Sequence, residues 1–210
     1  MSLKGKTLEA LVAQLAAKVP VPGGGAAAAI AASLGAASGS MAAIYTTRKK
    51  DEASGVAEKA RELSEALTGA AQTCLDLADA DAKAYAELQS TWKKDCELPP
   101  EKVEEIKANA LNVPVVMLRT CHQHAASVHD FLPMCNPGIR SDAYVSLHLL
   151  AGAARAAYQT VLVNNPSEDV KNEMATLLAD LSRFEKSTPT PSAVEETASA
   201  PAEPPVAGAQ

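Results

Sequence analysis

One carboxylate in this chain stands where an apolar side chain is expected. From residue 60 to residue 88, small and apolar residues recur at alternating steps of three and four, which predicts the buried face of a helix. The residues at these steps are Ala60, Leu63, Leu67, Ala70, Cys74, Leu77, Asp81, Ala84 and Leu88. Burial raises the pKa of a carboxyl group, and a raised pKa suits a general acid/base near neutral pH. Asp81 is therefore the predicted catalytic residue, unless the helix splays there and water reaches the carboxylate.

Asp79 provides a contrast on the same helix. Two residues along a helix are separated by about 200° around its axis, so Asp79 faces away from Asp81. We expect Asp79 on the solvated side of the helix, with no part in the chemistry.

The histidines and cysteines show no metal-binding pattern. They are His122, His124, His129, His148, Cys74, Cys96, Cys121 and Cys135. Neither an HExxH nor a CxxC sequence occurs, and His122 and His129 are too far apart along one helix to share an ion. We expect surface or capping histidines, reduced thiols and no metal.

A glycine turn and a helix of small residues precede the Asp81 segment. The sequence reads PGGG from Pro22 to Gly25 and continues as AAAAIAASLGAASGSM. It matches neither GxxxxGK[ST] nor GxGxxG, the phosphate-binding patterns. Glycines at a helix start permit unusual backbone angles or the close approach of a ligand, which we expect at Gly24. The GxxxG step of Gly35 and Gly39 predicts a tightly surrounded central helix, and the run is too weakly apolar for a comfortable membrane span.

Prolines, glycines and apolar periodicity divide the chain into six predicted helices. They span about 7–18, 26–48, 51–92, 100–131 with a kink at Pro114, a fifth that NPGIRSDA opens and that ends at 164, and 167–186. The predicted fold is all-α, an up-and-down bundle formed by residues 1–187. Residues 188–210 are rich in Pro, Ala and Glu without periodicity, so we expect a disordered tail there.

Composition and charge argue against some classes of binding partner. The formal net charge is −6, and an acidic chain does not favour nucleic acid. The first residues lack the apolar core of a signal peptide. We expect a cytoplasmic protein that binds neither nucleic acid nor a membrane.

Three segments, in this order, resemble the cyclodeaminase/cyclohydrolase family. They are the PGGG turn with its helix, DADAKAY at Asp79–Tyr85, and NPGIRSDAYV at Asn136–Val145. The family includes the C-terminal domain of formiminotransferase-cyclodeaminase and stand-alone methenyltetrahydrofolate cyclohydrolases. The resemblance spans about residues 8–186 and implies an all-α homodimer that binds folate in a crevice between antiparallel subunits.

The resemblance also implies roles for particular residues. The family's acid/base carboxylate is the second Asp of the DxDA segment, which is Asp81 here. The glycine turn and the third segment would line the folate site. The residues implied are Pro22, Gly23, Gly24, Gly25, Asn136, Ser141 and Asp142. The substrate would be a tetrahydrofolate derivative whose C–N bonds between N5 and N10 are rearranged, with no metal or redox cofactor.

Arg48 and Thr160 differ from the family pattern, which usually has Gly and commonly has Asn at these positions. Three functions stay open as a result. The first is a folate enzyme, either cyclodeaminase or cyclohydrolase, since both would use the same site. The second is a folate-binding module without turnover, which the two departures favour. The third is a helical assembly module, against which Asp81 argues because a scaffold gains nothing from a buried carboxylate.

Overall fold

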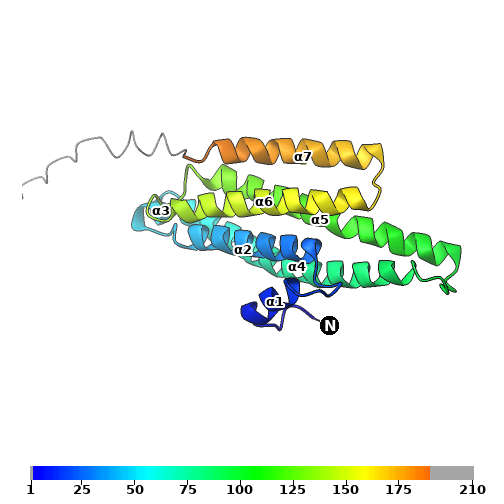
Figure 1. The fold of residues 1–210 in the computed structure, drawn as a ribbon. Coiled ribbons are helices and arrows are strands. Elements are labelled where there is room, and N and C mark those ends of the chain that lie inside the picture. Colours follow the sequence, from blue (N-terminus) through cyan, green and yellow to red (C-terminus); the bar gives the residue numbers. More distant parts are fainter. Residues whose placement is uncertain (1, 190–210) are drawn as a thin grey trace, which may run out of the picture.

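Seven α-helices form the regular structure of residues 2–189, the part of the chain that this computed structural model describes (Figure 1). They are α1 (Leu8–Leu15), α2 (Gly24–Ile44), α3 (Lys49–Ala53), α4 (Val56–Ser90), α5 (Pro100–Phe131), α6 (Arg140–Val163) and α7 (Glu168–Lys186). Residues 2–189 contain helices and no strands, so the predicted all-α fold is confirmed. Of the tail expected at residues 188–210, residues 190–210 lie outside the described part of the chain.

The structure has seven helices rather than six, because the predicted third helix is interrupted at Gly55. Gly55 adopts a φ of +76°, a left-handed conformation that favours glycine. The turn separates α3 from α4. Arg48 caps α3, since its backbone N–H donates to the Asp51 carboxylate at 2.9 Å and its guanidinium donates to the same carboxylate. The short helix therefore carries the chain from α2 into the long helix α4.

α2 is the central helix and packs against α4 and α6 (Figure 1). Its two GxxxG glycines are points of close approach. A Cβ atom at Gly35 would lie 3.0 Å from the Leu149 Cβ atom, and one at Gly39 would lie 2.6 Å from the Ser146 hydroxyl oxygen. The small residues of α2 thus let α6 approach its backbone, as the sequence predicts.

The same helix is long and apolar enough to cross a membrane, judged by length and composition alone. Half of its most apolar stretch is buried inside the bundle. Packing inside the bundle therefore accounts for half of this apolar stretch, and large apolar side chains of α2 such as Leu34 are left exposed.

The α4–α5 hairpin extends past the first turn of α2 (Figure 1). α2 begins at Gly24, beside Asp81 of α4. From Asp81, α4 continues to Ser90, and α5 starts again at Pro100. The last turns of α4 and the first turns of α5 therefore lie beyond the start of α2, and the candidate site occupies the space that this leaves.

Two histidines hold α7 on the bundle. His122 Nε2 lies 3.2 Å from Asp180 Oδ2, and His148 Nδ1 lies 3.2 Å from Glu185 Oε1. Thr188, at the start of the expected tail, is buried as well, and its hydroxyl lies 3.2 Å from His148 Nε2. The packed part of the chain therefore includes Thr188.

Candidate functional site

The Asp81 side chain lies against the first turn of α2. A Cβ atom at Gly25 would collide with both carboxylate oxygens of Asp81, with Oδ2 only 2.7 Å away. A hydrogen atom is therefore the only substituent that fits at residue 25. Gly25 thus allows the carboxylate of α4 to rest on the backbone of α2.

The close contact with the Asp81 side chain is at Gly25 and not at Gly24. A Cβ atom at Gly24 would meet nothing within 4 Å. The unusual backbone angle expected at Gly24 is not found, because the positive φ values among residues 2–189 belong to Gly55 and Asn165. The close approach of a ligand to Gly24 stays a prediction, and Gly24 lines the cavity described below.

Burial raises the pKa of the Asp81 carboxyl above its ordinary value, because the charged form loses hydration. A contact with the backbone N–H of Ala26 acts in the opposite direction and favours the carboxylate. That N–H belongs to the first turn of α2, where helix N–H groups have no partner within the helix. Asp81 is therefore protonated more readily than an exposed aspartate, while the Ala26 N–H stabilises its carboxylate form.

Asp79 lies on the other side of α4, as the helical phase predicts. Its carboxylate accepts hydrogen bonds from the Ser2 hydroxyl at 2.6 Å and from the Leu3 backbone N–H. Burial opposes the shift, but these bonds and nearby positive charge lower the pKa of Asp79. The two aspartates thus have pKa values displaced in opposite directions by their surroundings.

A cavity of about 460 Å³ opens beside Asp81. Its walls come from the segment before α2, the first turn of α2, the last turns of α4, and parts of α5 and α6. The lining residues are Pro20, Val21, Gly23, Gly24, Gly25, Asp81, Ala84, Tyr85, Leu88, Trp92, Ala110, Thr160, Val163 and Asn164. A volume of this size is in the range of small-molecule sites. Apart from Asp81, the wall is mostly apolar and aromatic.

Some lining residues were not expected from the sequence as site residues. Tyr85 follows Asp81 at four residues on the same face of α4, and Trp92 follows at eleven, just past the end of that helix; this spacing is the signal that could have found them. Thr160 lies in the wall, and its hydroxyl donates to the Ala157 carbonyl at 2.7 Å. Asn164 follows one turn later and donates from Nδ2 to the Thr160 carbonyl at 2.8 Å. One of the two departures from the family pattern therefore lies in the cavity.

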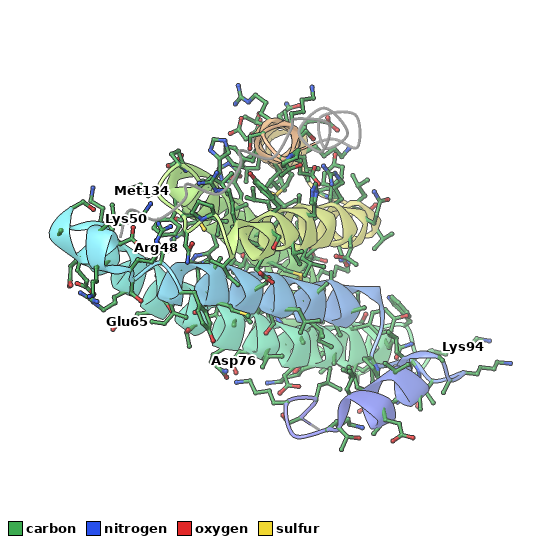
Figure 2. All side chains as sticks on the ribbon, turned by 90° about the vertical axis from the view of Figure 1, so that its left-hand side faces the viewer. Arg48, Lys50, Glu65, Asp76, Lys94 and Met134 are labelled. Carbon is green, nitrogen blue, oxygen red and sulfur yellow. The ribbon has the colours of Figure 1, made fainter. Side chains whose placement is uncertain are left out.

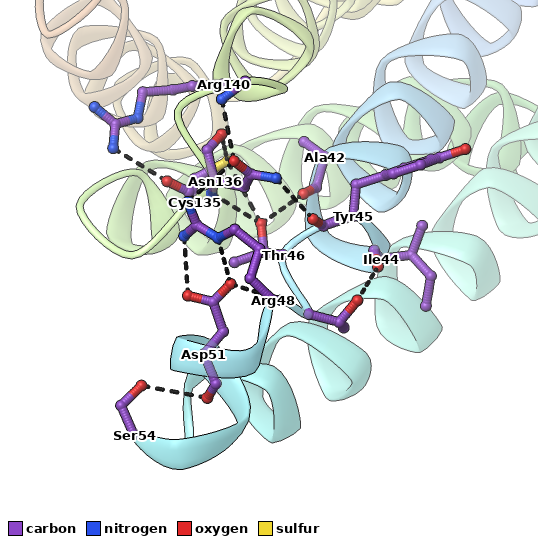
Figure 3. A network of polar contacts seen from close by, with 12 residues as sticks. Ala42, Ile44, Tyr45, Thr46, Arg48, Asp51, Ser54, Cys135, Asn136 and Arg140 are labelled. Atoms are coloured by element: carbon purple, nitrogen blue, oxygen red, sulfur yellow. Dashed lines mark hydrogen bonds and ion pairs between the residues drawn. The ribbon is translucent and has the colours of Figure 1, made fainter. Parts of the chain in front are cut away.

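The other predicted binding residues lie at the opposite end of α2. Asn136 donates from Nδ2 to the carbonyl of Tyr45, which ends α2, and accepts from the Arg48 guanidinium at 3.1 Å (Figure 3). Ser141 and Asp142 are in the first turn of α6, which follows directly. Figure 2 faces this end of the bundle, where Arg48 is labelled. A helix of 21 residues is about 30 Å long, so this group lies far from Asp81 within one chain.

The structure therefore brings some of the predicted residues together and separates the rest. Asp81 and Gly23–Gly25 share one cavity. Pro22 is buried beside them but lines a smaller cavity next to α1. Asn136 has a structural role, because its side chain ties the loop before α6 to the end of α2.

The part of the chain that the structure describes holds no cluster of metal-ligating side chains. No three His, Cys, Asp or Glu side chains gather there in a way that could hold an ion. His122 and His148 contact carboxylates of α7, and His129 stacks on Phe184 with ring centroids 4.8 Å apart. The histidines have packing roles.

Replacing Gly25 by alanine should destabilise the protein, whereas Gly24→Ala should not. The added methyl group at residue 25 must displace the Asp81 carboxylate or separate α2 from α4, at a cost of about 1–3 kcal/mol. Denaturant unfolding followed by circular dichroism measures both variants. Equal free energies of unfolding for the two would contradict the contact between Gly25 and Asp81.

Asp81→Asn should make the protein more stable at neutral pH. Burial raises the Asp81 pKa in the folded state above its unfolded value, so the carboxyl's contribution to stability is lost as pH rises through the raised pKa. Asparagine carries no charge at any pH. The melting temperature of the variant should exceed that of the wild type at pH 7, and the difference should shrink toward pH ~4, near the unfolded pKa. A lower melting temperature for the variant at pH 7 would argue against the raised pKa.

Comparison with known proteins identifies relatives of this chain. The family model described as formiminotransferase-cyclodeaminase matches residues 7–183. A methenyltetrahydrofolate cyclohydrolase from Methylorubrum extorquens is 30% identical over 165 residues, which are 76% of this chain and 79% of the relative. A formimidoyltransferase-cyclodeaminase from Rattus norvegicus is 29% identical over 182 residues, which are 82% of this chain but 33% of that longer protein.

A solved structure has the same fold. The formiminotetrahydrofolate cyclodeaminase from Thermotoga maritima superposes with a TM-score of 0.75 at 21% identity, over 88% of this chain and 92% of the other. At this identity the likeness concerns the fold alone. Since the family model covers almost all of the described residues, the chain belongs to the formiminotransferase-cyclodeaminase family.

Proposed function

We propose that this protein is a folate one-carbon enzyme that acts on the C–N bonds between N5 and N10 of tetrahydrofolate. The observation that carries the proposal is the Asp81 carboxylate, held at the start of α2 with a raised pKa and facing a cavity of ligand size. Membership of a family whose relatives are named as cyclohydrolase and cyclodeaminase supports it. Either activity fits the site.

Both reactions take a proton from the attacking group and give a proton to the leaving nitrogen. In cyclodeamination, the N10 amine attacks the formimino carbon on N5, the N10 proton passes to the formimino nitrogen, and a further proton lets that nitrogen leave as ammonia. In cyclohydrolysis, water attacks the methenyl carbon and loses a proton, and the bond from that carbon to N5 breaks as N5 is protonated and the new hydroxyl group gives up its proton to become the formyl oxygen. We assign both transfers to Asp81, because a carboxyl group with a raised pKa can act as base and then as acid.

The proposed chemistry involves no change of oxidation state at the reacting carbon. Proton transfer and a tetrahedral intermediate account for both reactions, so we propose that neither a metal nor a redox cofactor takes part. The tetrahydrofolate derivative is the substrate, and we place the enzyme in the cytoplasm.

We also propose that the protein works as a homodimer. The outward face of α2 carries a stripe of apolar side chains with 45–58% of their area exposed. These are Leu34, Met41 and Ile44. If a second copy packs on this stripe with its α2 antiparallel, the end that carries Asn136, Ser141 and Asp142 comes to lie beside the Asp81 cavity of the other copy. Such a dimer would join the two groups of predicted residues that one chain holds about 30 Å apart.

Asp81→Asn should abolish turnover while folate binding is kept. The substitution removes the titrating group, and general acid/base catalysis typically contributes on the order of 10²- to 10⁴-fold. Turnover is followed through the absorbance of methenyltetrahydrofolate, with formimino- and methenyl-tetrahydrofolate supplied in turn. Asp79→Asn is the control, since Asp79 faces the N-terminal segment. Binding of either substrate without turnover by the wild type would instead favour a folate-binding module.

Leu34→Glu should convert the dimer to a monomer and reduce activity, although the Asp81 cavity is unchanged. A charge placed on the apolar stripe opposes its burial against a second copy. Sedimentation velocity at micromolar concentration measures the state, and Leu98→Glu, on an exposed leucine outside the stripe, is the control. A monomeric wild type with full activity would contradict the proposed dimer.

A further inference from the structure

The Asp81 cavity continues into a second one. That second cavity, of about 500 Å³, lies between the end of α4, the first turns of α5 and the end of α6. Four residues line both cavities: Leu88, Trp92, Val163 and Asn164. The two cavities therefore form one elongated cleft, with Asp81 in the inner part and Trp92 where the parts meet.

Two exposed aromatic side chains stand along this cleft. Trp92 has 61% of its area exposed and Tyr85 has 39%. Their rings meet edge to face, with centroids 6.1 Å apart and planes at 83°. Because α2 begins beside Asp81, the helix that covers the earlier turns of α4 does not extend over these residues. Uncovered aromatic rings at the wall of a cleft are typical of a surface that a planar ligand covers.

The two ends of the cleft carry different polar groups. The inner part has Asp81, and the outer part has Glu104 and Lys107 of α5, of which Lys107 is the one cation among the described residues lining either cavity. Lys107 lies 2.8 Å from Glu104, and both side chains are exposed, so this pair is solvated and can exchange partners. Asn165 lies at the same outer end. The outer end therefore suits a polar, carboxylate-bearing group better than a second ring system.

We propose that Trp92, assisted by Tyr85, stacks on the aminobenzoyl ring of the substrate and that the outer cavity receives the glutamyl end. This assignment rests on the proposed function, since it requires N10 to lie at Asp81. Tyr85 is about 6 Å along the helix from Asp81, and its ring meets that of Trp92. The aromatic pair thus stands where the ring attached to N10 would follow.

Calorimetric titration with two probes tests this assignment. 5-Formyltetrahydrofolate is the full-length probe, and 6-methyltetrahydropterin, titrated to millimolar concentration, lacks the aminobenzoylglutamate. Trp92→Ala should weaken binding of the full-length probe about tenfold, a typical loss for one ring stack. It should leave binding of the pterin within about twofold of the wild type, because the pterin does not reach Trp92. Trp92→Phe should restore most of the affinity, and circular dichroism checks that each variant folds.

Leu98→Ala is the matched control, since Leu98 is an exposed apolar residue six positions from Trp92 that lines neither cavity. It should bind both probes as the wild type does. Unchanged binding of 5-formyltetrahydrofolate by Trp92→Ala would overturn the stacking role while the proposed function stands. An equal loss for both probes would place the pterin on Trp92 and overturn the orientation. Failure of the wild type to bind either probe would instead overturn the proposed function and this inference together.

Discussion

The Asp81 carboxylate reaches the backbone of α2 only because residue 25 has no side chain. Any Cβ atom there would occupy the space of the carboxylate oxygens, so α2 and α4 would have to separate or the carboxylate would have to rotate away. The contact fixes the register of the two helices and holds a carboxyl group against the first turn of α2, where the Ala26 N–H contacts it. Burial and the Ala26 N–H then act on the pKa of Asp81 in opposite directions. The packing of Asp81 against the first turn of α2 therefore determines both where its carboxylate lies and how its pKa is shifted.

The cavity exists because α4 and α5 extend beyond the point where α2 begins. α2 packs closely on α4 and α6 along its small residues, and little space is left there, as the contacts at Gly35 and Gly39 show. Where α2 begins, the α4–α5 hairpin continues alone, and the face of α4 that α2 would have covered becomes a cavity wall. Much of the wall is therefore made of helices rather than mobile loops, which suits a site that must hold its substrate at one carboxylate.

Local sequence patterns predict those features of the structure that depend on a single helix. The place of Asp81 on a buried face, the opposite direction of Asp79 and most helix boundaries follow from periodicity and from prolines and glycines. The break at Gly55 does not, because a glycine in a helical pattern is compatible with both a helix interior and a left-handed turn. The choice between Gly24 and Gly25 depends on how α2 is rotated toward α4, and the exposure of Trp92 depends on where α2 begins. These are relations between elements, which no single segment encodes.

The polar residues at the end of α2, far from Asp81, have structural contacts of their own. Arg48 at the far end of α2 is already paired with Asp51, and its remaining contact holds Asn136, so these polar groups stabilise the turn from α2 into α3. Lys49 and Lys50, directly after them, are exposed. Between the two ends of α2 runs an apolar stripe that residues 2–189 leave exposed. A cavity with one carboxylate at one end, two exposed lysines at the other and an apolar stripe between them are what the proposed antiparallel dimer would bring together. In that dimer the exposed stripe of α2 would be buried, and the lysine-bearing end of one copy would lie beside the Asp81 cavity of the other.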